Sequence, residues 1–251
     1  MDTKKSNVIT IASPKGGVGK TTLTILFSYI LKDLNKKVLL IDLDPQNSLS
    51  SYFNKYILNI EKYNIYNLLK KDVYFDQCIN KINDYISIIP SNPILENFNS
   101  EVLNYKDVLL EYHFNRNISN YNFDYILIDT PPNLGFILGN SLNVADYIII
   151  PVQVERFSVE SLSILMDAIN NVKDFRNKSF SISIIENQFL KNRNTFRDLE
   201  NLLYREYAFY IKGKIHYYNS VKVLINELLE PSLKEAYYKE AKNALKTIVS
   251  L

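Results

Sequence analysis

The sequence predicts an α/β fold: a doubly wound, mainly parallel sheet with helices on both faces, in a single domain over residues 1–251. Two observations carry this prediction. Short apolar, β-branched runs, which read as buried strands, alternate along the chain with segments of helical periodicity. Several of these runs end in glycine or acidic residues, as strands do when they deliver a binding site to the carboxyl edge of a sheet.

The composition limits the class of protein. Apolar residues make up 47% and charged residues 22% of the chain, which is ordinary for a globular protein with a sizeable core. The net charge of +2 indicates no general affinity for nucleic acid. Cys78 is the only cysteine, which excludes a disulfide framework and cysteine-rich metal sites within the chain. No apolar run approaches the roughly 18 residues of a membrane span, and residues 1–7 are too polar for a signal peptide, so we expect a cytoplasmic protein.

The first strand, residues 8–12, leads into a glycine-rich loop and then into a helix. Glycine tolerates backbone angles closed to other residues, so Gly16, Gly17 and Gly19 allow successive N–H groups to turn toward one anion. Lys20 adds a positive charge for the β- and γ-phosphates, and Thr21 offers a hydroxyl to Mg²⁺. The predicted nucleotide site consists of Lys15, Gly16, Gly17, Val18, Gly19, Lys20, Thr21 and Thr22.

The next two elements bring acidic residues to the same place. Residues 22–35 have an apolar helical face for the sheet, and residues 37–42 form a buried strand that ends in Asp42, with Asp44 close behind. Ligands of open α/β sheets bind at the carboxyl ends of the strands, which places both carboxylates beside the glycine loop. Near a triphosphate, a carboxylate either holds Mg²⁺ through its waters or orients the attacking water.

A third acidic strand end follows after a less informative stretch. Residues 65–71 and 94–115 are predicted to be helices and residues 86–90 a short strand, all within the same domain. Residues 125–128 are apolar and are followed by Asp129, the pattern of a buried parallel strand that delivers one carboxylate to a site. We expect Asp129 to hold Mg²⁺ through water.

These motifs resemble those of the ParA/MinD family of ATPases, whose phosphate loop is a deviant Walker A motif. In that family the early lysine of the loop reaches the nucleotide of a partner subunit, and Lys15 is the matching residue. The Asp-Leu-Asp-Pro-Gln run at residues 42–46 is similar to the second family motif, which implies that Asp44 activates water and that Asp42 lies in the outer shell of the metal. The resemblance also implies that Asn187 contacts adenine. The predicted catalytic residues are thus Lys15, Lys20 and Asp44, and the predicted metal site contains Thr21, Asp42 and Asp129.

The second half of the chain continues the alternation. Residues 147–155 read as a buried strand whose Pro-Val-Gln-Val-Glu ending again resembles ParA proteins. Residues 158–175 form an amphipathic helix, and residues 181–187 are the last convincing strand. After Pro231, residues 232–251 read as a helix that carries acidic residues among its lysines, which favours docking on the domain over insertion into a membrane.

A basic segment lies before this last helix. Between residues 188 and 222, seven lysine and arginine residues against three acidic residues leave a charge of +4, which suits contact with a phosphate backbone. Related ATPases bind DNA nonspecifically through basic residues of the C-terminal third. The candidates here are Arg193, Arg197, Lys212, Lys214 and Lys222, and the alternative is an ordinary solvated surface. Residues 215–219 read Ile-His-Tyr-Tyr-Asn and depart from the Ile-Pro-Arg-Asn-like run of many ParA proteins.

The resemblance implies a DNA partition ATPase that binds ATP and Mg²⁺, forms a homodimer around two nucleotides and binds nucleoid DNA nonspecifically in that state. A ParB-like centromere-binding protein would stimulate its slow hydrolysis. Three alternatives remain at this point: a membrane-positioning switch like MinD, a reductase like nitrogenase iron protein, and an ATP binder that does not hydrolyse. The reductase needs more cysteines than Cys78, and the last helix argues against stable membrane association.

Overall fold

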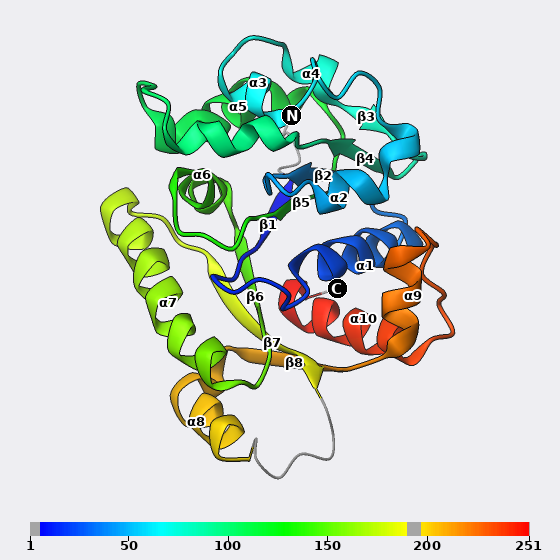
Figure 1. Ribbon diagram of the computed structural model, residues 1–251, viewed down its shortest axis with the longest axis vertical. Helices are drawn as coiled ribbons and strands as arrows, with labels where there is room; N and C mark the ends of the chain where they lie inside the picture. Colours follow the sequence, from blue (N-terminus) through cyan, green and yellow to red (C-terminus); the bar gives the residue numbers. More distant parts are fainter. Residues whose placement is uncertain (1–5, 190–196, 251) are drawn as a thin grey trace.

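The computed structural model describes residues 6–189 and 197–250, without the side chains of residues 156–160, 189 and 197. In this part of the chain one eight-stranded sheet has the order β3-β4-β2-β5-β1-β6-β7-β8 (Figure 1). The strands are β1 (Asn7–Ile11), β2 (Val38–Asp42), β3 (Asn80–Lys81), β4 (Ile86–Ile89), β5 (Tyr125–Asp129), β6 (Tyr147–Val152), β7 (Ser181–Phe189) and β8 (Ile211–His216). All neighbouring pairs are parallel except β3 with β4, which confirms the predicted mainly parallel sheet.

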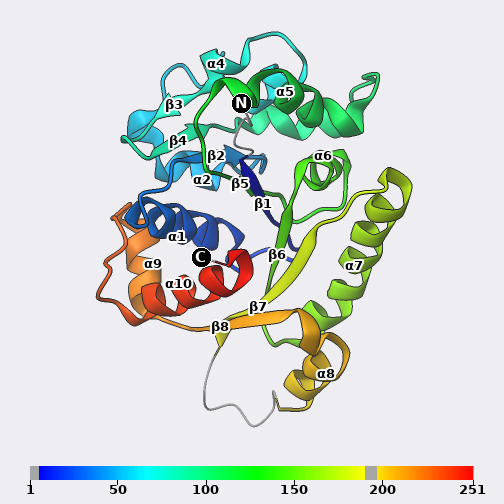
Figure 2. The same cartoon turned by 180° about the vertical axis from the view of Figure 1, so that it is seen from behind.

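Helices cover both faces of this sheet. The α-helices are α1 (Lys20–Asp33), α2 (Ser48–Tyr52), α3 (Ile65–Leu69), α4 (Phe75–Cys78), α5 (Leu109–Asn117), α6 (Phe136–Val144), α7 (Arg156–Arg176), α8 (Arg197–Tyr207), α9 (Asn219–Asn226) and α10 (Ala236–Val249). Short 3₁₀ turns cover Asn54–Tyr56, Pro93–Asn99, Lys106–Val108, Ile118–Asn120 and Ala208–Tyr210. Helices α1, α9 and α10 pack on one face, and α5, α6 and α7 lie on the other, as both views show (Figures 1 and 2).

The central strands are buried on both sides because successive side chains point to opposite faces. Ile9 of β1 belongs to the core under α1 and α10, whereas its neighbour Val8 belongs to the core under α3 and α5. In β2, Leu40 likewise packs in the core under α1 and α10, and Leu39 packs in the core under α3 and α5. This explains why these strands are continuous apolar runs in the sequence rather than alternating ones.

The topology brings the three motifs together. After β1 the chain adds β2 and β4 on one side, returns through β5 to the place beside β1, and then adds β6 on the other side. In the register of the sheet, Asp129 at the end of β5 stands opposite both Asp42 of β2 and Ile11 of β1. The glycine loop and the acidic strand ends therefore meet at the carboxyl edge, as predicted.

The prediction of one helix over residues 94–115 is wrong. The structure has a 3₁₀ segment at Pro93–Asn99, a second at Lys106–Val108, and α5 only from Leu109. Tyr105 adopts a φ of 56°, in the left-handed region that interrupts a helix. The buried Lys106 ammonium donates to the carbonyls of Asn99 and Glu101 at 2.9 and 2.7 Å, so the chain folds back around this side chain.

The structure extends the predictions for the C-terminal third. Strand β8, which the sequence analysis did not identify, pairs in parallel with residues 184–189 of β7 and adds an eighth strand at the edge of the sheet. The final helix begins at Ala236 rather than at residue 232, and Leu233 is exposed. Tyr237, Leu245 and Ile248 are buried in the same core as α1, which confirms that this helix is docked on the domain. None of the helices in the described ranges has both the length and the apolarity needed to span a membrane.

Candidate nucleotide site

The loop between β1 and α1 depends on glycine for its shape. Gly17 and Gly19 have φ values of 76° and 94°, in the region that L-residues with side chains rarely adopt. A Cβ on Gly19 would also lie 2.3 Å from the side-chain nitrogen of Asn187. The backbone angle therefore favours glycine, and a Cβ here would displace the Asn187 amide; α1 starts directly after this turn, at Lys20.

Side-chain amides from two neighbouring strands hold the carbonyl groups of this loop. Asn187 donates to the carbonyl of Val18 at 2.7 Å, and Gln188 and Gln153 donate to that of Gly17 at 3.0 and 3.2 Å. Fixing the carbonyls on this side leaves the N–H groups of the loop available to an anion. The sequence analysis gave no role to Gln153 or Gln188, although the Pro-Val-Gln ending of the β6 strand was a usable signal.

Lys20 lies among the carboxylates rather than in solvent. Its side chain is buried, and its ammonium donates to the carbonyl of Lys15 at 3.2 Å. Burial lowers the pKa of Lys20, while the nearby charges of Asp129 and Asp44 act in the opposite direction. The ammonium is thus placed where the phosphate loop and the acidic strand ends meet.

Asp129 and Thr21 form the part of the site that fits a magnesium ion. Asp129 is fully buried, and its Oδ2 accepts a hydrogen bond of 2.7 Å from the Thr21 hydroxyl. Its other oxygen, Oδ1, has no hydrogen-bond partner in the described part of the chain. Within the described residues no set of three His, Cys, Asp or Glu side chains could hold a metal alone, so an ion here would need phosphate oxygens and water as further ligands. That mixed coordination is the one Mg²⁺ prefers at nucleotide sites.

Asp42 and Asp44 have different surroundings. Both oxygens of the buried Asp42 accept hydrogen bonds: Oδ2 from the backbone and hydroxyl of Ser50 at 2.8 and 2.7 Å, and Oδ1 from the backbone of Asp44 at 3.1 Å. Asp42 therefore holds the turn between β2 and α2 in place. Asp44 is 9% exposed, and its Oδ1 accepts from the Gln46 backbone at 2.9 Å. Its placement beside Lys20 agrees with a role next to the phosphates.

The buried carboxyls predict an unusual pH dependence of stability. Burial raises the pKa of Asp42 to about 7, and burial together with the charge of Asp42 raises the pKa of Asp129 well above its usual range. A carboxyl that binds its proton more tightly in the folded chain stabilises that chain at low pH and loses this contribution as the pH rises toward the folded pKa. We expect the free energy of unfolding of the nucleotide-free protein to fall by on the order of 2 kcal/mol between about pH 5 and pH 8.

Urea unfolding at several pH values measures this slope. Asp129→Asn keeps an acceptor for the Thr21 hydroxyl and removes one of the two titrating groups, so it should make the profile less steep. Asp84→Asn is the matched control, because Asp84 is exposed and pairs with Lys81 at 2.8 Å. A wild-type stability that rises over this pH range would contradict the prediction.

The Lys15 side chain forms an ion pair with a residue of its own chain. Its ammonium lies 2.5 Å from Oε2 of Glu155, at the junction of β6 and α7. The two side chains are 29% and 51% exposed, so this ion pair is open to water and to a competing anion. The sequence analysis did not identify Glu155 as its partner, although that residue closes the Pro-Val-Gln-Val-Glu ending.

A cavity of about 170 Å³ adjoins the loop between α1, β8 and α9. Asn187, the predicted adenine contact, lines it together with Thr22 and Tyr217. Glu240 of α10 fixes two of the lining side chains: it accepts from the Tyr218 hydroxyl at 2.9 Å and lies 2.8 Å from Nδ1 of His216. Four of the residues that depart from the family pattern, Ile215 to Tyr218, thus line this cavity.

The predicted DNA-binding residues do not form one described patch. Arg193 lies outside the described residues, and for Arg197 only the backbone, at the start of α8, is described. Lys214 lies 3.1 Å from the buried Glu186 and 2.6 Å from Glu200, so its charge is balanced within the chain. The two remaining candidates are separated: Lys212 is on β8, and Lys222 lines the cavity beside the phosphate loop.

Comparison with known proteins decides the family. The family model AAA_31, an AAA domain, matches residues 6–182. Soj, the sporulation initiation inhibitor protein of Bacillus subtilis, is 32% identical over 178 residues, which cover 70% of this chain and 69% of Soj. A crystal structure of a plasmid partition protein from Borrelia burgdorferi B31 bound to AMPPNP superposes with a TM-score of 0.88 at 35% identity, covering 98% of this chain and 99% of that one. The chain belongs to the ParA/Soj family of P-loop ATPases.

Two further proteins are similar to this chain. An uncharacterized protein of Methanocaldococcus jannaschii is 37% identical over 174 residues, which cover 66% of each chain. The matched segments thus span about two thirds of the curated relatives. An ATP complex of a Cyanothece McdA variant, at 22% identity and a TM-score of 0.86, supports the fold alone. The relative from Borrelia burgdorferi was solved with AMPPNP, an ATP analogue. A nucleotide ligand in that relative agrees with the glycine loop described above.

Proposed function

We propose that this ParA/Soj-family chain is a DNA partition ATPase that closes as a homodimer around two Mg-ATP molecules and binds DNA nonspecifically in that state. The observation that carries the proposal is the Thr21–Asp129 pair, which leaves one buried Asp129 oxygen without a hydrogen-bond partner among the described residues, next to a loop whose shape depends on Gly17 and Gly19. This arrangement suits a magnesium nucleotide. The plasmid partition protein from Borrelia burgdorferi supplies the biological context.

In this proposal the chemistry is positioning and charge neutralisation. The loop N–H groups and Lys20 bind the phosphates at the N-terminus of α1. Thr21 and Asp129 would hold Mg²⁺, which when bound neutralises charge on the phosphate oxygens. Asp44 accepts a proton from, and orients, the attacking water, while Asp42 fixes the turn that carries Asp44. Because no stronger base stands nearby among the described residues, the intrinsic rate is expected to be slow.

Dimer formation would exchange the partner of Lys15. In the single chain its ammonium is paired with a half-exposed carboxylate of Glu155. A triphosphate bound to a second subunit offers a denser negative charge than the Glu155 carboxylate, and the ion pair with Glu155 is open enough to exchange for it. The catalytic site is thus proposed to be complete only when a second copy supplies its Lys15.

The proposal also assigns residues to DNA binding and a partner to its release. Basic residues of the C-terminal third, Arg193, Arg197, Lys212 and Lys222, are proposed to contact phosphates of DNA, whereas Lys214 is committed to Glu186 and Glu200. A ParB-like centromere-binding protein is proposed to stimulate hydrolysis, in the cytoplasm on the nucleoid. The buried apolar face of α10 gives no support to a MinD-like membrane anchor.

One experiment tests the proposal: binding to random-sequence duplex DNA with Mg-ATP, with Mg-ADP and without nucleotide. We expect binding at least about tenfold tighter with Mg-ATP, together with a dimer in sedimentation and a steep loss of affinity with salt. Lys15→Gln should bind ATP with an affinity within about threefold of wild type and yet remain monomeric. Equal DNA affinity in all three nucleotide states would rule out the proposed cycle.

A further inference from the structure

Three side-chain amides hold the carbonyl groups of the phosphate loop, and we call them the amide clamp: Gln153, Asn187 and Gln188. Gln153 directly follows β6, and the other two lie near the end of β7. Gln153 and Gln188 donate to the carbonyl of Gly17, and Asn187 donates to that of Val18. The loop is thus tied to the ends of two strands that lie far from it in the sequence.

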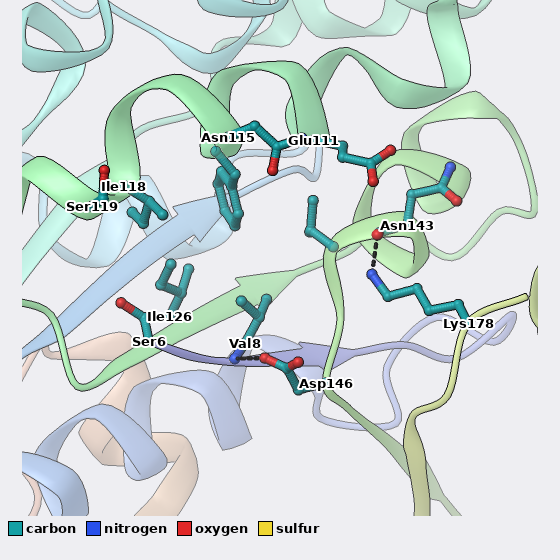
Figure 3. A pocket seen from close by; sticks show the side chains of 12 residues that line it. Ser6, Val8, Glu111, Asn115, Ile118, Ser119, Ile126, Asn143, Asp146 and Lys178 are labelled. Carbon is teal, nitrogen blue, oxygen red and sulfur yellow. Dashed lines mark hydrogen bonds between the residues drawn. The ribbon is translucent and has the colours of Figure 1, made fainter. Parts of the chain in front are cut away.

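Strand β6 fixes β1 and its loop at both ends. Just before β6, Oδ2 of Asp146 accepts from the Val8 backbone at 2.9 Å, at the start of β1 (Figure 3). Just after β6, Gln153 donates to the Gly17 carbonyl at 3.2 Å. Between these two contacts, residues 9–11 of β1 pair in parallel with β6. The amide of Gln153 is therefore carried by a strand whose register with β1 is fixed.

A bulge in β7 brings two neighbouring side chains to the same loop. Successive side chains of a regular strand point to opposite faces of the sheet. Residues 186–189 of β7 stand opposite residues 214–216 of β8, so β7 has one extra residue here. Such a bulge redirects side chains, and Asn187 and Gln188 both reach the loop between β1 and α1.

The backbone of Gln188 is strained. Its φ of 56° lies in the left-handed region, which a residue with a side chain rarely adopts and which glycine adopts freely. Strained residues of this kind gather at functional sites, where the strain serves to place a group. The group placed here is the Gln188 amide, which donates to the Gly17 carbonyl at 3.0 Å.

The carbonyls that the amide clamp holds belong to two successive peptide units. The carbonyl of Gly17 shares its unit with the N–H of Val18, and the carbonyl of Val18 shares its unit with the N–H of Gly19. In a trans unit the two groups point in opposite directions, so fixing the carbonyl also fixes the direction of the N–H. Donation to a carbonyl polarises the unit and makes its N–H a stronger donor. Neither N–H donates to a backbone carbonyl among the described residues.

We propose that the three amides are positioning residues of the nucleotide site proposed above, on which this inference rests. They orient the N–H groups of Val18 and Gly19 toward the phosphates. The amide nitrogen of Asn187, 2.7 Å from the Val18 carbonyl, is committed to this task rather than to the base. The amide clamp acts through the phosphate donors alone, so its loss should weaken the binding of a triphosphate with or without a base.

Calorimetric titration of the full chain with Mg-AMPPNP, alone and in competition with Mg-tripolyphosphate, tests the amide clamp. A Gln153→Met/Gln188→Met double variant keeps side chains of similar length and removes both donors to Gly17. We expect it to bind each ligand at least about tenfold more weakly than wild type. Gln77→Met is the matched control: Gln77 is exposed on α4, and its amide oxygen also bonds a backbone group, accepting from Tyr74 at 2.9 Å. It should bind both ligands as wild type does.

A Gln188→Gly variant separates positioning from a structural role. Glycine adopts the left-handed backbone without strain but has no amide. The urea midpoint of the nucleotide-free variant should be no lower than that of wild type, while its affinity for both ligands falls at least about threefold. A residue that only stabilised the fold would change stability and affinity in the same direction.

The outcomes distinguish the amide clamp from the site that it serves. Wild-type affinity of the double variant for both ligands would overturn the proposal, as would a loss for AMPPNP alone with tripolyphosphate binding retained. A Gln188→Gly protein that loses stability and affinity together would also contradict it. If the wild-type chain bound neither ligand, the nucleotide site itself would be refuted, and the amide clamp with it.

Discussion

Lys20→Ala is expected to weaken Mg-ATP binding at least about 100-fold, which corresponds to roughly 2.7 kcal/mol. The reason is electrostatic: the ammonium lies buried between the phosphate loop and the charges of Asp129 and Asp44. Without it, a triphosphate would approach the carboxylates of Asp129 and Asp44 with no ammonium from this loop to offset their charge. Isothermal titration calorimetry with a non-hydrolysable ATP analogue and Mg²⁺ measures the loss.

Lys37→Ala provides the matched control. Lys37 is exposed just before β2, and its hydrogen bond to the Asp124 carboxylate comes from the backbone N–H, which alanine retains. This variant should bind nucleotide as wild type does. Thermal unfolding of both variants separates loss of binding from loss of fold. A folded Lys20→Ala protein with wild-type affinity would refute the phosphate role of Lys20.

Asp44→Asn should reduce ATP hydrolysis at least about 100-fold while nucleotide affinity stays within about threefold of wild type. Asparagine preserves an acceptor for the Gln46 backbone, so the turn should keep its shape. It cannot take a proton from water, and the uncleaved complex should therefore accumulate as an ATP-bound dimer on DNA. Phosphate release in the presence of DNA, together with a mobility shift, measures both effects.

Two further variants test this assignment. Asp167→Asn removes an exposed carboxylate of α7 and should leave hydrolysis unchanged. Asp42→Asn should instead reduce stability, because Asp42 accepts hydrogen bonds from Ser50 and Asp44. If Asp44→Asn turns over ATP at the wild-type rate, the attacking water is oriented by another group.

The sequence was most informative where chemistry and local structure coincide. The glycine loop required residues without a Cβ, and the apolar strands required burial on both faces, so the loop, β1, β2 and β5 could be predicted from short segments. The prediction failed over residues 94–115, where helical periodicity was present but Tyr105 and the inward-turned Lys106 break the segment. Strand β8 was missed because a short strand with lysines and a glycine, Ile211–His216, resembles a loop in isolation.

The sequence by itself determined the family, the nucleotide loop and the acidic residues at three strand ends, because each is a pattern of neighbouring residues. Only the tertiary structure decided which side chains contact the nucleotide loop and the charged residues near it. Asn187 and Gln153 bind the loop carbonyls, Glu155 pairs with Lys15, and Lys214 pairs with Glu186. These contacts join residues more than twenty positions apart, and pairing over such distances depends on the strand order of the sheet, which no local pattern specifies.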